Sequence, residues 1–296
     1  IAIKFFSLIH SRYSLIIVPM EEKGLINLEY LSILELNGKG SFELLQGQIT
    51  ADMEKVSDNE SVMGAICDIK GRVISSFFVT KNLKEDGGYF LIGDRELMTL
   101  TKDLLQKYQP FYDTSFSLQN HYNFFAIKES CILRDYPDTN LNQSFQEYDN
   151  FWRIHFLNKE FHIIATTESN KLQNYHLSDD IDPWILDEIN NLNFEVSSVS
   201  TCKFTPHELG YHITPRVDFE KGCYTGQEIV ARMHYRAKKL PKMLIRESNE
   251  KKEILSKVLD NDKKAIGLVL LTAKKDEQNF CLLSMNKNFT EQPFEF

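Results

Sequence analysis

Short runs of apolar residues separated by turn-forming residues recur along the chain, which is the pattern of β-strands. The first run, residues 31–36, is followed by turn residues at 37–40 and then by a short segment with the apolar residues of a helix. Two further runs, 62–67 and 73–80, are separated by residues 68–71, whose Asp, Lys and Gly suit a tight turn. The pattern predicts a strand and a helix, followed by a β-hairpin.

An amphipathic helix is predicted after the next apolar run, residues 89–92. Asp94 is placed to cap the first turn, and Pro110 ends the helical pattern. Between them the apolar side chains recur at intervals of three and four residues: Leu97, Leu100, Leu104 and Tyr108.

The second half of the chain repeats this plan. Residues 134–150 are mostly polar and predict a joint, and the apolar runs 151–156 and 161–166 predict a second hairpin. Asp182 and Pro183 then begin a helix with apolar residues inside it. Strands mixed with crossing helices favour an α+β fold in which two related lobes face each other.

Four segments follow from these patterns and from the Lys- and Glu-rich composition after residue 239. We expect an N-terminal extension, a first lobe that need not be continuous in the sequence, a second lobe, and a small C-terminal β-domain. Their expected bounds are 1–27, 28–135, 136–240 and 241–296.

Composition excludes several classes of protein. Of the 296 residues, 42% are hydrophobic, so the chain can bury a core and is neither disordered nor fibrous. The net charge of -8 disfavours broad, non-specific binding of nucleic acids. Charged residues interrupt the apolar N-terminal segment, so neither a signal peptide nor a membrane anchor is expected. Five dispersed cysteines without a C-x-x-C pair favour the reducing cytoplasm and predict no metal site.

Residues 221–232 contain the candidate chemistry. Thr225 and Glu228 have the spacing of a capping box, which predicts a helix beginning at Gly226. Cys223 would then lie just before a helix N-terminus and close to Lys221, where a thiolate is stabilised. The alternative is a packed cysteine in a turn between glycines, because free cysteines are commonly buried.

Three ordered motifs carry a resemblance to a known family: residues 45–52 (LQGQITAD), 67–72 (CDIKGR) and 221–228 (KGCYTGQE), the last preceded by 204–208 (FTPHE). The chain resembles the YgfZ-type folate-binding proteins, which are related to the glycine-cleavage T-protein, an aminomethyltransferase. A motif of eight residues that contains a cysteine is far more specific than a lone glycine motif.

The resemblance implies two lobes and a small C-terminal β-barrel-like domain around a central folate channel. It also implies a tetrahydrofolate-binding accessory protein that supports iron–sulfur cluster assembly or repair in enzymes such as those of tRNA methylthiolation. The expected partners are folate and iron–sulfur enzymes or assembly factors, with an indirect link to tRNA, and the protein is expected to be a monomer without membrane contact.

The resemblance also carries over site residues. Cys223 would be the functional thiol, assisted by Lys221. Tetrahydrofolate or a derivative would contact Trp184, Lys70, Arg72, Gln227, Glu228 and Arg232. The framework of the motif would be Gly222, Tyr224, Thr225 and Gly226. Trp184 could instead fill the core, and the basic run 232–239 could be an ordinary solvated face.

Two alternative functions stay open. One is a folate-dependent aminomethyltransferase, but Ser75 and Ser76 stand where the T-proteins carry an acidic pair. A hydroxyl cannot replace a carboxylate in stabilising a developing cation, so transfer is disfavoured. The other is a non-catalytic RNA-linked adaptor, which the acidic balance of the chain disfavours.

Overall fold

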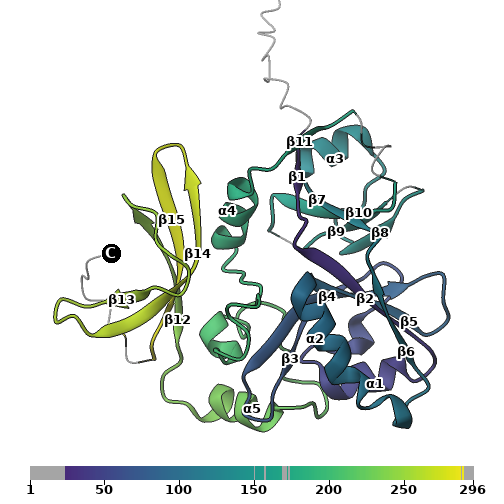
Figure 1. Cartoon of the computed structure of the whole chain (residues 1–296), viewed down its shortest axis with the longest axis horizontal. Helices are drawn as coiled ribbons and strands as arrows, with labels where there is room; N and C mark the ends of the chain where they lie inside the picture. The colour runs from purple at the N-terminus through teal and green to yellow at the C-terminus, as the bar shows by residue number, and fades with distance from the viewer. Residues whose placement is uncertain are drawn as a thin grey trace, which may run out of the picture.

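The first lobe contains a five-stranded antiparallel sheet. The computed structural model describes residues 24–149, 151–156, 158–168, 172, 174–287 and 289. The sheet has the order β3-β4-β5-β2-β6 (Figure 1). Its strands are β2 (Leu31–Asn37), β3 (Val62–Cys67), β4 (Val73–Asn82), β5 (Gly88–Asp94) and β6 (Ser115–Gln119). Its helices are α1 (Ser41–Gln48), α2 (Arg95–Gln106) and the short 3-10 turns η1 (Met53–Lys55) and η2 (Gln109–Phe111).

The predicted hairpin and helix cap of this lobe are confirmed. β3 and β4 form the expected hairpin, with Val62 opposite Val79 and Cys67 opposite Val73. The Asp94 carboxylate caps α2, because it accepts hydrogen bonds from the backbone N–H groups of Glu96 and Leu97, each at 3.1 Å. The local sequence was sufficient to predict the turn and the cap, because each is formed by residues that are neighbours in the sequence.

The second lobe is a six-stranded sheet with the order β11-β1-β7-β10-β9-β8. Its strands are β1 (Gly24–Asn27), β7 (Asn123–Lys128), β8 (Phe145–Glu147), β9 (Trp152–Ile154), β10 (Phe161–Thr166) and β11 (His176–Ser178). The helices α3 (Glu129–Asp135) and α4 (Asp182–Asn190) follow β7 and β11 in the sequence. Thus β1, expected in the extension, and β7, expected in the first lobe, both pair in this sheet. Residues 1–23 of the expected extension lie outside the described residues.

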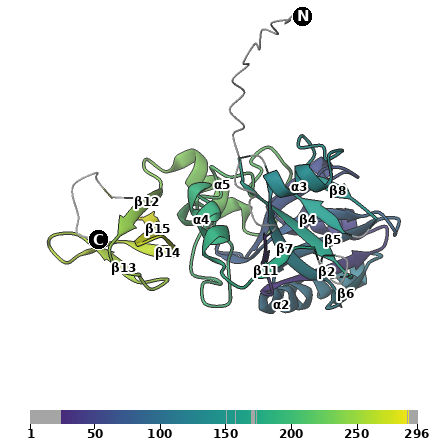
Figure 2. The same cartoon turned by 90° about the horizontal axis from the view of Figure 1, so that it is seen from above.

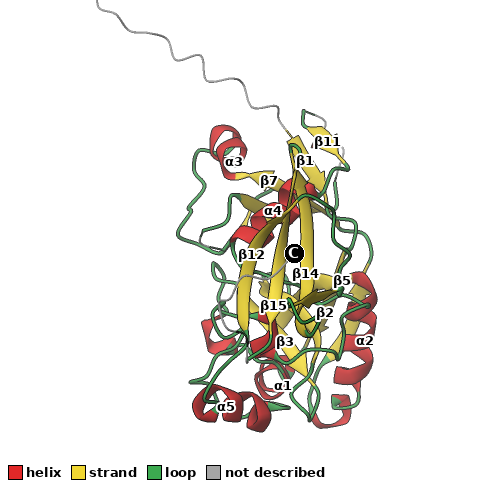
Figure 3. Cartoon of the chain, turned by 90° about the vertical axis from the view of Figure 1, so that its left-hand side faces the viewer, coloured by secondary structure: helices red, strands yellow, loops and turns green. Residues whose placement is uncertain are grey.

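The C-terminal domain is a four-stranded antiparallel sheet with the order β12-β15-β14-β13. Its strands are β12 (Lys242–Ser248), β13 (Lys257–Leu259), β14 (Ala265–Lys275) and β15 (Gln278–Met285). Figure 2 shows this sheet at one end of the molecule, with α4 and α5 (Gln227–Arg236) between it and the lobes. Figure 3 shows α1, α2 and α5 gathered at the end of the molecule opposite α3. The 3-10 turn η4 (Pro206–Leu209) contacts α5, β12 and β15.

One hydrophobic core joins the two lobes. Phe90 of β5 stacks on Trp152 of β9 with ring centroids 4.8 Å apart, and Phe78 of β4 stacks on Phe156 at 5.1 Å. Trp184 of α4 belongs to the same buried cluster. Because each sheet buries the apolar face of the other, neither lobe can be moved without exposing apolar surface to water. The α+β class is confirmed.

Within the described part of the chain, the helices are too short or too polar to cross a bilayer.

Two buried histidines predict that the fold is sensitive to acid. Burial, with smaller effects of His155 and Arg153, lowers the pKa of His162 to about 2. Burial, with smaller effects of His212 and His234, lowers the pKa of His207 to about 4. The unfolded chain takes up these protons as the pH falls through about 6.5. The free energy of unfolding should therefore be highest above pH 6.5 and decrease as the pH falls from 6.5 to 4. His207 alone should account for about 3 kcal/mol of this decrease.

Urea unfolding at pH 7.5, 6.0 and 5.0 measures this loss. Between pH 7.5 and 5.0 the free energy of unfolding should decrease less in His207→Gln than in the wild type. In His121→Gln, which changes an exposed histidine, it should decrease as much as in the wild type. Identical pH dependence of His207→Gln and wild type would contradict the assignment.

Candidate functional site

Lys221 ties the motif at 221–228 to the motif at 45–52. Its ammonium group donates hydrogen bonds to the backbone carbonyls of Gln46, Ile49 and Ala51, each at 2.8 Å. The side chain is buried, and burial lowers the pKa of Lys221 to about 8. Its nitrogen lies 5.4 Å from the ring centroid of the buried Tyr224. All three ammonium protons can be used by backbone carbonyls of the first lobe.

The hairpin tip at 68–71 packs against the beginning of α5. Gly226 has φ +85°, and a Cβ atom there would lie 2.4 Å from the Asp68 carbonyl oxygen. Gly71 has φ +70°, and a Cβ atom there would lie 3.0 Å from Ile229. Both positions therefore require glycine, for backbone conformation and for space. The three motifs that are separate in the sequence meet at one place in the structure.

The predicted capping box of α5 is wrong. The helix begins at Gln227 with Gly226 as its N-cap, and no side chain caps it. The Thr225 hydroxyl instead donates to the Gln48 side-chain oxygen at 2.9 Å. A capping box of the same type occurs at η4, where the Glu208 carboxylate accepts from the backbone N–H of Thr205 at 2.7 Å. In α5, the hydrogen bond from Thr225 to the distant Gln48 thus replaces the predicted bond between Thr225 and the backbone of its own helix.

Cys223 is exposed in the loop before α5, next to the exposed Gly222. The packed-cysteine alternative therefore does not describe it. Lys221 directs its ammonium group to the carbonyls of the first lobe. Cys202 is also exposed, whereas three cysteines are buried: Cys67, Cys131 and Cys281. Burial raises the pKa of Cys67 to about 12, which makes that thiol unreactive.

Trp184 lies in the core. Its side chain is 2% exposed, and its indole N–H donates to the Tyr30 hydroxyl at 3.0 Å. The Lys159 ammonium lies 4.9 Å from its ring centroid. This placement agrees with the core alternative, since no face of the ring is open for a ligand to stack on.

The other predicted contacts lie around the hairpin tip and α5. The Arg72 guanidinium donates to the Lys203 carbonyl at 2.8 Å and to the Glu208 carboxylate at 3.1 Å. Gln227 donates to the Gly222 carbonyl at 3.4 Å. Three are exposed: Lys70, Glu228 and Arg232. None of the residues predicted to contact folate lines the cavity described next.

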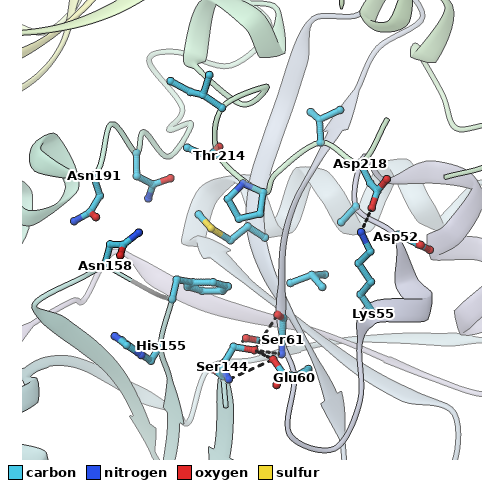
Figure 4. Close-up of a pocket in the computed structure, with 18 of the residues that line it drawn as sticks. Asp52, Lys55, Glu60, Ser61, Ser144, His155, Asn158, Asn191, Thr214 and Asp218 are labelled. Carbon is cyan, nitrogen blue, oxygen red and sulfur yellow. Dashed lines mark hydrogen bonds and ion pairs between the residues drawn. The ribbon is translucent and has the colours of Figure 1, made fainter. Parts of the chain in front are cut away.

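A cavity of about 830 Å³ lies between the two lobes. Its walls come from residues 51–63 of the first lobe, 141–159 of the second, 191–193 after α4, 213–220 before the motif, and 234–235 of α5. Figure 4 shows Asn191, Thr214 and Asn158 on one side of the cavity and Lys55 with Asp218 on the other. Sequence reasoning missed these residues because they come from five separate segments.

The segment 213–220 is held against the first lobe by Thr50. The Thr50 hydroxyl donates to the Arg216 carbonyl at 2.5 Å, and the Thr50 carbonyl accepts from the backbone N–H of Asp218 at 2.9 Å. Asp218 forms an ion pair with Lys55 across the same gap. Thr50 belongs to the motif at 45–52, so that motif positions a cavity wall as well as the Lys221 side chain.

Two charged pairs lie largely buried beside the cavity. Lys159 pairs with Glu188, and Arg216 pairs with Glu195. Asn193 connects the two pairs: its carbonyl accepts from Arg216 Nε at 3.2 Å, and its amide donates to Glu188. Burial raises the pKa of Glu195, and the Arg216 charge opposes that effect. Buried charges of this kind require such partners, so the network holds this part of the wall in place.

Some polar atoms at the cavity have no hydrogen-bond partner among the described residues. Thr214 Oγ1 and His234 Nδ1 are buried in its wall without one. Behind His234 lie His207 and His212, whose rings are 4.9 Å apart, and both ring nitrogens of His207 also lack partners. Because unpaired buried polar atoms are unfavourable, this side of the cavity is suited to a ligand with hydrogen-bonding groups.

A second cluster near the cavity combines Glu129, His155 and His162, with possible ligand atoms within 4.8 Å of one another. The Arg153 guanidinium, which can only donate, lies 3.2 Å from His162 Nδ1. His162 Nδ1 must accept, so its proton is on Nε2, which faces Glu129 at 3.4 Å. A metal would need a lone pair on that nitrogen, and the cluster is therefore a hydrogen-bonded network.

Two lobes around a cavity with a third sheet beside them define the fold class. The structure is similar to the crystal structure of glycine cleavage system aminomethyltransferase T from Bartonella henselae, with a TM-score of 0.67 and 12% sequence identity. The similarity covers 88% of this chain and 78% of that one. The chain therefore has the fold of the T-protein aminomethyltransferases.

Sequence comparison identifies a more specific relationship. The chain is 25% identical over 222 residues to the tRNA-modifying protein YgfZ of Photobacterium profundum, covering 72% of this chain and 66% of that protein. It is 27% identical over 240 residues to the same protein of Colwellia psychrerythraea, covering 75% and 71%. No protein-family model matches. This chain is thus a relative of the YgfZ tRNA-modifying proteins, and it spans about two thirds of the length of the first of them.

The Lys221 contacts predict a large effect on stability. Lys221→Met keeps the aliphatic stem but leaves the carbonyls of Gln46, Ile49 and Ala51 without their donor. The free energy of unfolding should fall by about 3 kcal/mol, which urea denaturation would measure. Lys203→Met, at an exposed lysine, is the control and should change it by less than about 0.5 kcal/mol. Equal effects of both substitutions would contradict the role of Lys221.

Proposed function

We propose that this protein binds tetrahydrofolate or a derivative in the cavity between its lobes and supports iron–sulfur enzymes that modify tRNA in the cytoplasm. The observation that carries the proposal is the cavity itself. It is lined by both lobes and by the segment before the 221–228 motif. The T-protein fold and the YgfZ relatives support it. Cys223 is the proposed functional thiol, outside the cavity and open to a partner.

The residues of the cavity suit a folate. Its volume of about 830 Å³ lies within the range of small-molecule sites. Phe156 provides a flat apolar wall and is itself supported by Phe78 behind it. Thr214 Oγ1 and His234 Nδ1 are available for the polar edge of a pterin. Lys55 is exposed in the wall and pairs with Asp218, and an exposed ammonium group can also attract the glutamate carboxylates.

Aminomethyl transfer is the weaker alternative. Ser75 and Ser76, which stand where the related T-proteins have an acidic pair, are fully buried in β4. The Ser76 hydroxyl accepts a hydrogen bond from the Val196 backbone N–H at 2.8 Å. A carboxylate at this buried position would need a cationic partner, and neither serine lines the cavity. Binding without a transfer reaction of its own is therefore the function that this site favours.

Phe156 and Trp184 provide a matched test of where folate binds. Phe156→Ala removes the ring on the cavity wall and should weaken tetrahydrofolate binding at least fivefold, which corresponds to the loss of about 1 kcal/mol of stacking. Trp184→Phe alters a ring of the core and should lower stability with the affinity unchanged. Isothermal titration calorimetry with tetrahydrofolate, under oxygen-free conditions, measures both affinities.

A wild-type protein that binds no tetrahydrofolate would refute the proposed ligand. Weaker binding in Trp184→Phe than in Phe156→Ala would place the ligand against α4, as the resemblance alone implied, and not in the cavity.

The two exposed cysteines test the proposed thiol. Cys223→Ser retains size and a hydrogen-bonding group but removes the soft, nucleophilic sulfur, so support of a cluster-dependent tRNA methylthiolation enzyme should fall. Cys202→Ser makes the same change at the other exposed cysteine and should retain full support. The methylthiolated fraction of tRNA, measured by mass spectrometry in cells that depend on each variant, is the readout. Equal support by both variants would exclude Cys223.

A further inference from the structure

The exposed side of α5 and the residues after it form a basic face. This face consists of Arg232, Tyr235, Arg236, Lys238 and Lys239, all of which are exposed. Arg232 lies about one helical turn from both Tyr235 and Arg236, at spacings of three and four residues. Tyr235 is 63% exposed.

The four cations of the basic face have no partners among the described residues. No hydrogen bond or ion pair joins the side chains of Arg232, Arg236, Lys238 or Lys239 to another residue in that part of the chain. By contrast, Arg72 nearby pairs with Glu208, and Lys55 pairs with Asp218. The face therefore concentrates four unneutralised charges on a protein whose net charge is -8.

Tyr235 connects the basic face to the cavity. Its ring is held by two perpendicular contacts, with His234 at 4.9 Å and Phe219 at 6.3 Å between centroids. It also contributes to the cavity wall. An exposed aromatic ring on a helix that also carries Arg232 and Arg236 can stack a base while the arginines bind the adjoining phosphates.

We infer that a single-stranded segment of RNA docks on the basic face, with its phosphates on the four cations and one base on Tyr235. The choice of RNA rests on the proposed function, whereas the anionic character of the ligand follows from the face itself. A solvated charge run needs no exposed ring. An acidic protein surface would also satisfy the charges and pack on Tyr235, because tyrosine is frequent in protein interfaces, so the proposed function is what favours RNA. A duplex hides its bases, so stacking on Tyr235 requires a single strand.

Salt dependence gives the inference a quantitative form. Four phosphate contacts on a single strand predict a slope of log K against log salt of about -3. Binding of a fluorescein-labelled 12-nucleotide uridine strand, followed by anisotropy without any folate, should weaken about 50-fold between 50 and 200 mM KCl. Arg232→Gln with Arg236→Gln should reduce the slope to about half, and Tyr235→Ala should weaken binding at least fivefold with the slope unchanged.

The control is Lys263→Gln with Lys264→Gln, which removes the same charge from exposed lysines before β14 and should bind as wild type. No measurable binding by wild type at 50 mM KCl would overturn the inference, as would equal slopes for the two double variants. Tighter binding to a duplex of the same length would also overturn it. Phe156→Ala should retain RNA binding, so a failure of the folate proposal and a failure of this one are distinguishable.

Discussion

The arrangement of this protein depends on the buried ammonium group of Lys221. Its three hydrogen bonds, each 2.8 Å, join the end of α1 and the loop after it to the segment that leads into α5. A buried cation requires compensation, and carbonyl groups of an irregular backbone supply it without a second charge. Gly71 and Gly226 then allow the hairpin tip to pack against the same segment. Together these contacts bring the three motifs to one place in the structure.

The cavity is a consequence of this junction and of the core shared by the lobes. Thr50, in the loop that Lys221 holds, fixes the wall segment 213–220, and Phe78 supports Phe156 in the opposite wall. The motifs therefore act mostly from behind the cavity. The same fold is shared with the aminomethyltransferase at 12% sequence identity, and a fold by itself does not specify the residues that bind a ligand.

The proposed activities occupy two neighbouring regions. The cavity offers apolar walls and unpaired polar atoms for a small molecule, whereas Cys223 and the four cations of the basic face lie outside it, before, along and after α5. His234 and Tyr235 are adjacent on α5 and face the cavity together. The helix α5 therefore contributes to both regions.

The sequence by itself determined the features that neighbouring residues make: the β3–β4 hairpin, the Asp94 cap of α2, the α+β class and the three motifs. Only the tertiary structure decided what distant residues make. Thr225 bonds to Gln48 and not to its own helix, and Trp184 is buried against Tyr30. The cavity is assembled from five separate segments. Periodicity and spacing describe contacts within one element, but these contacts join residues more than 100 positions apart, whose proximity exists only once the chain has folded.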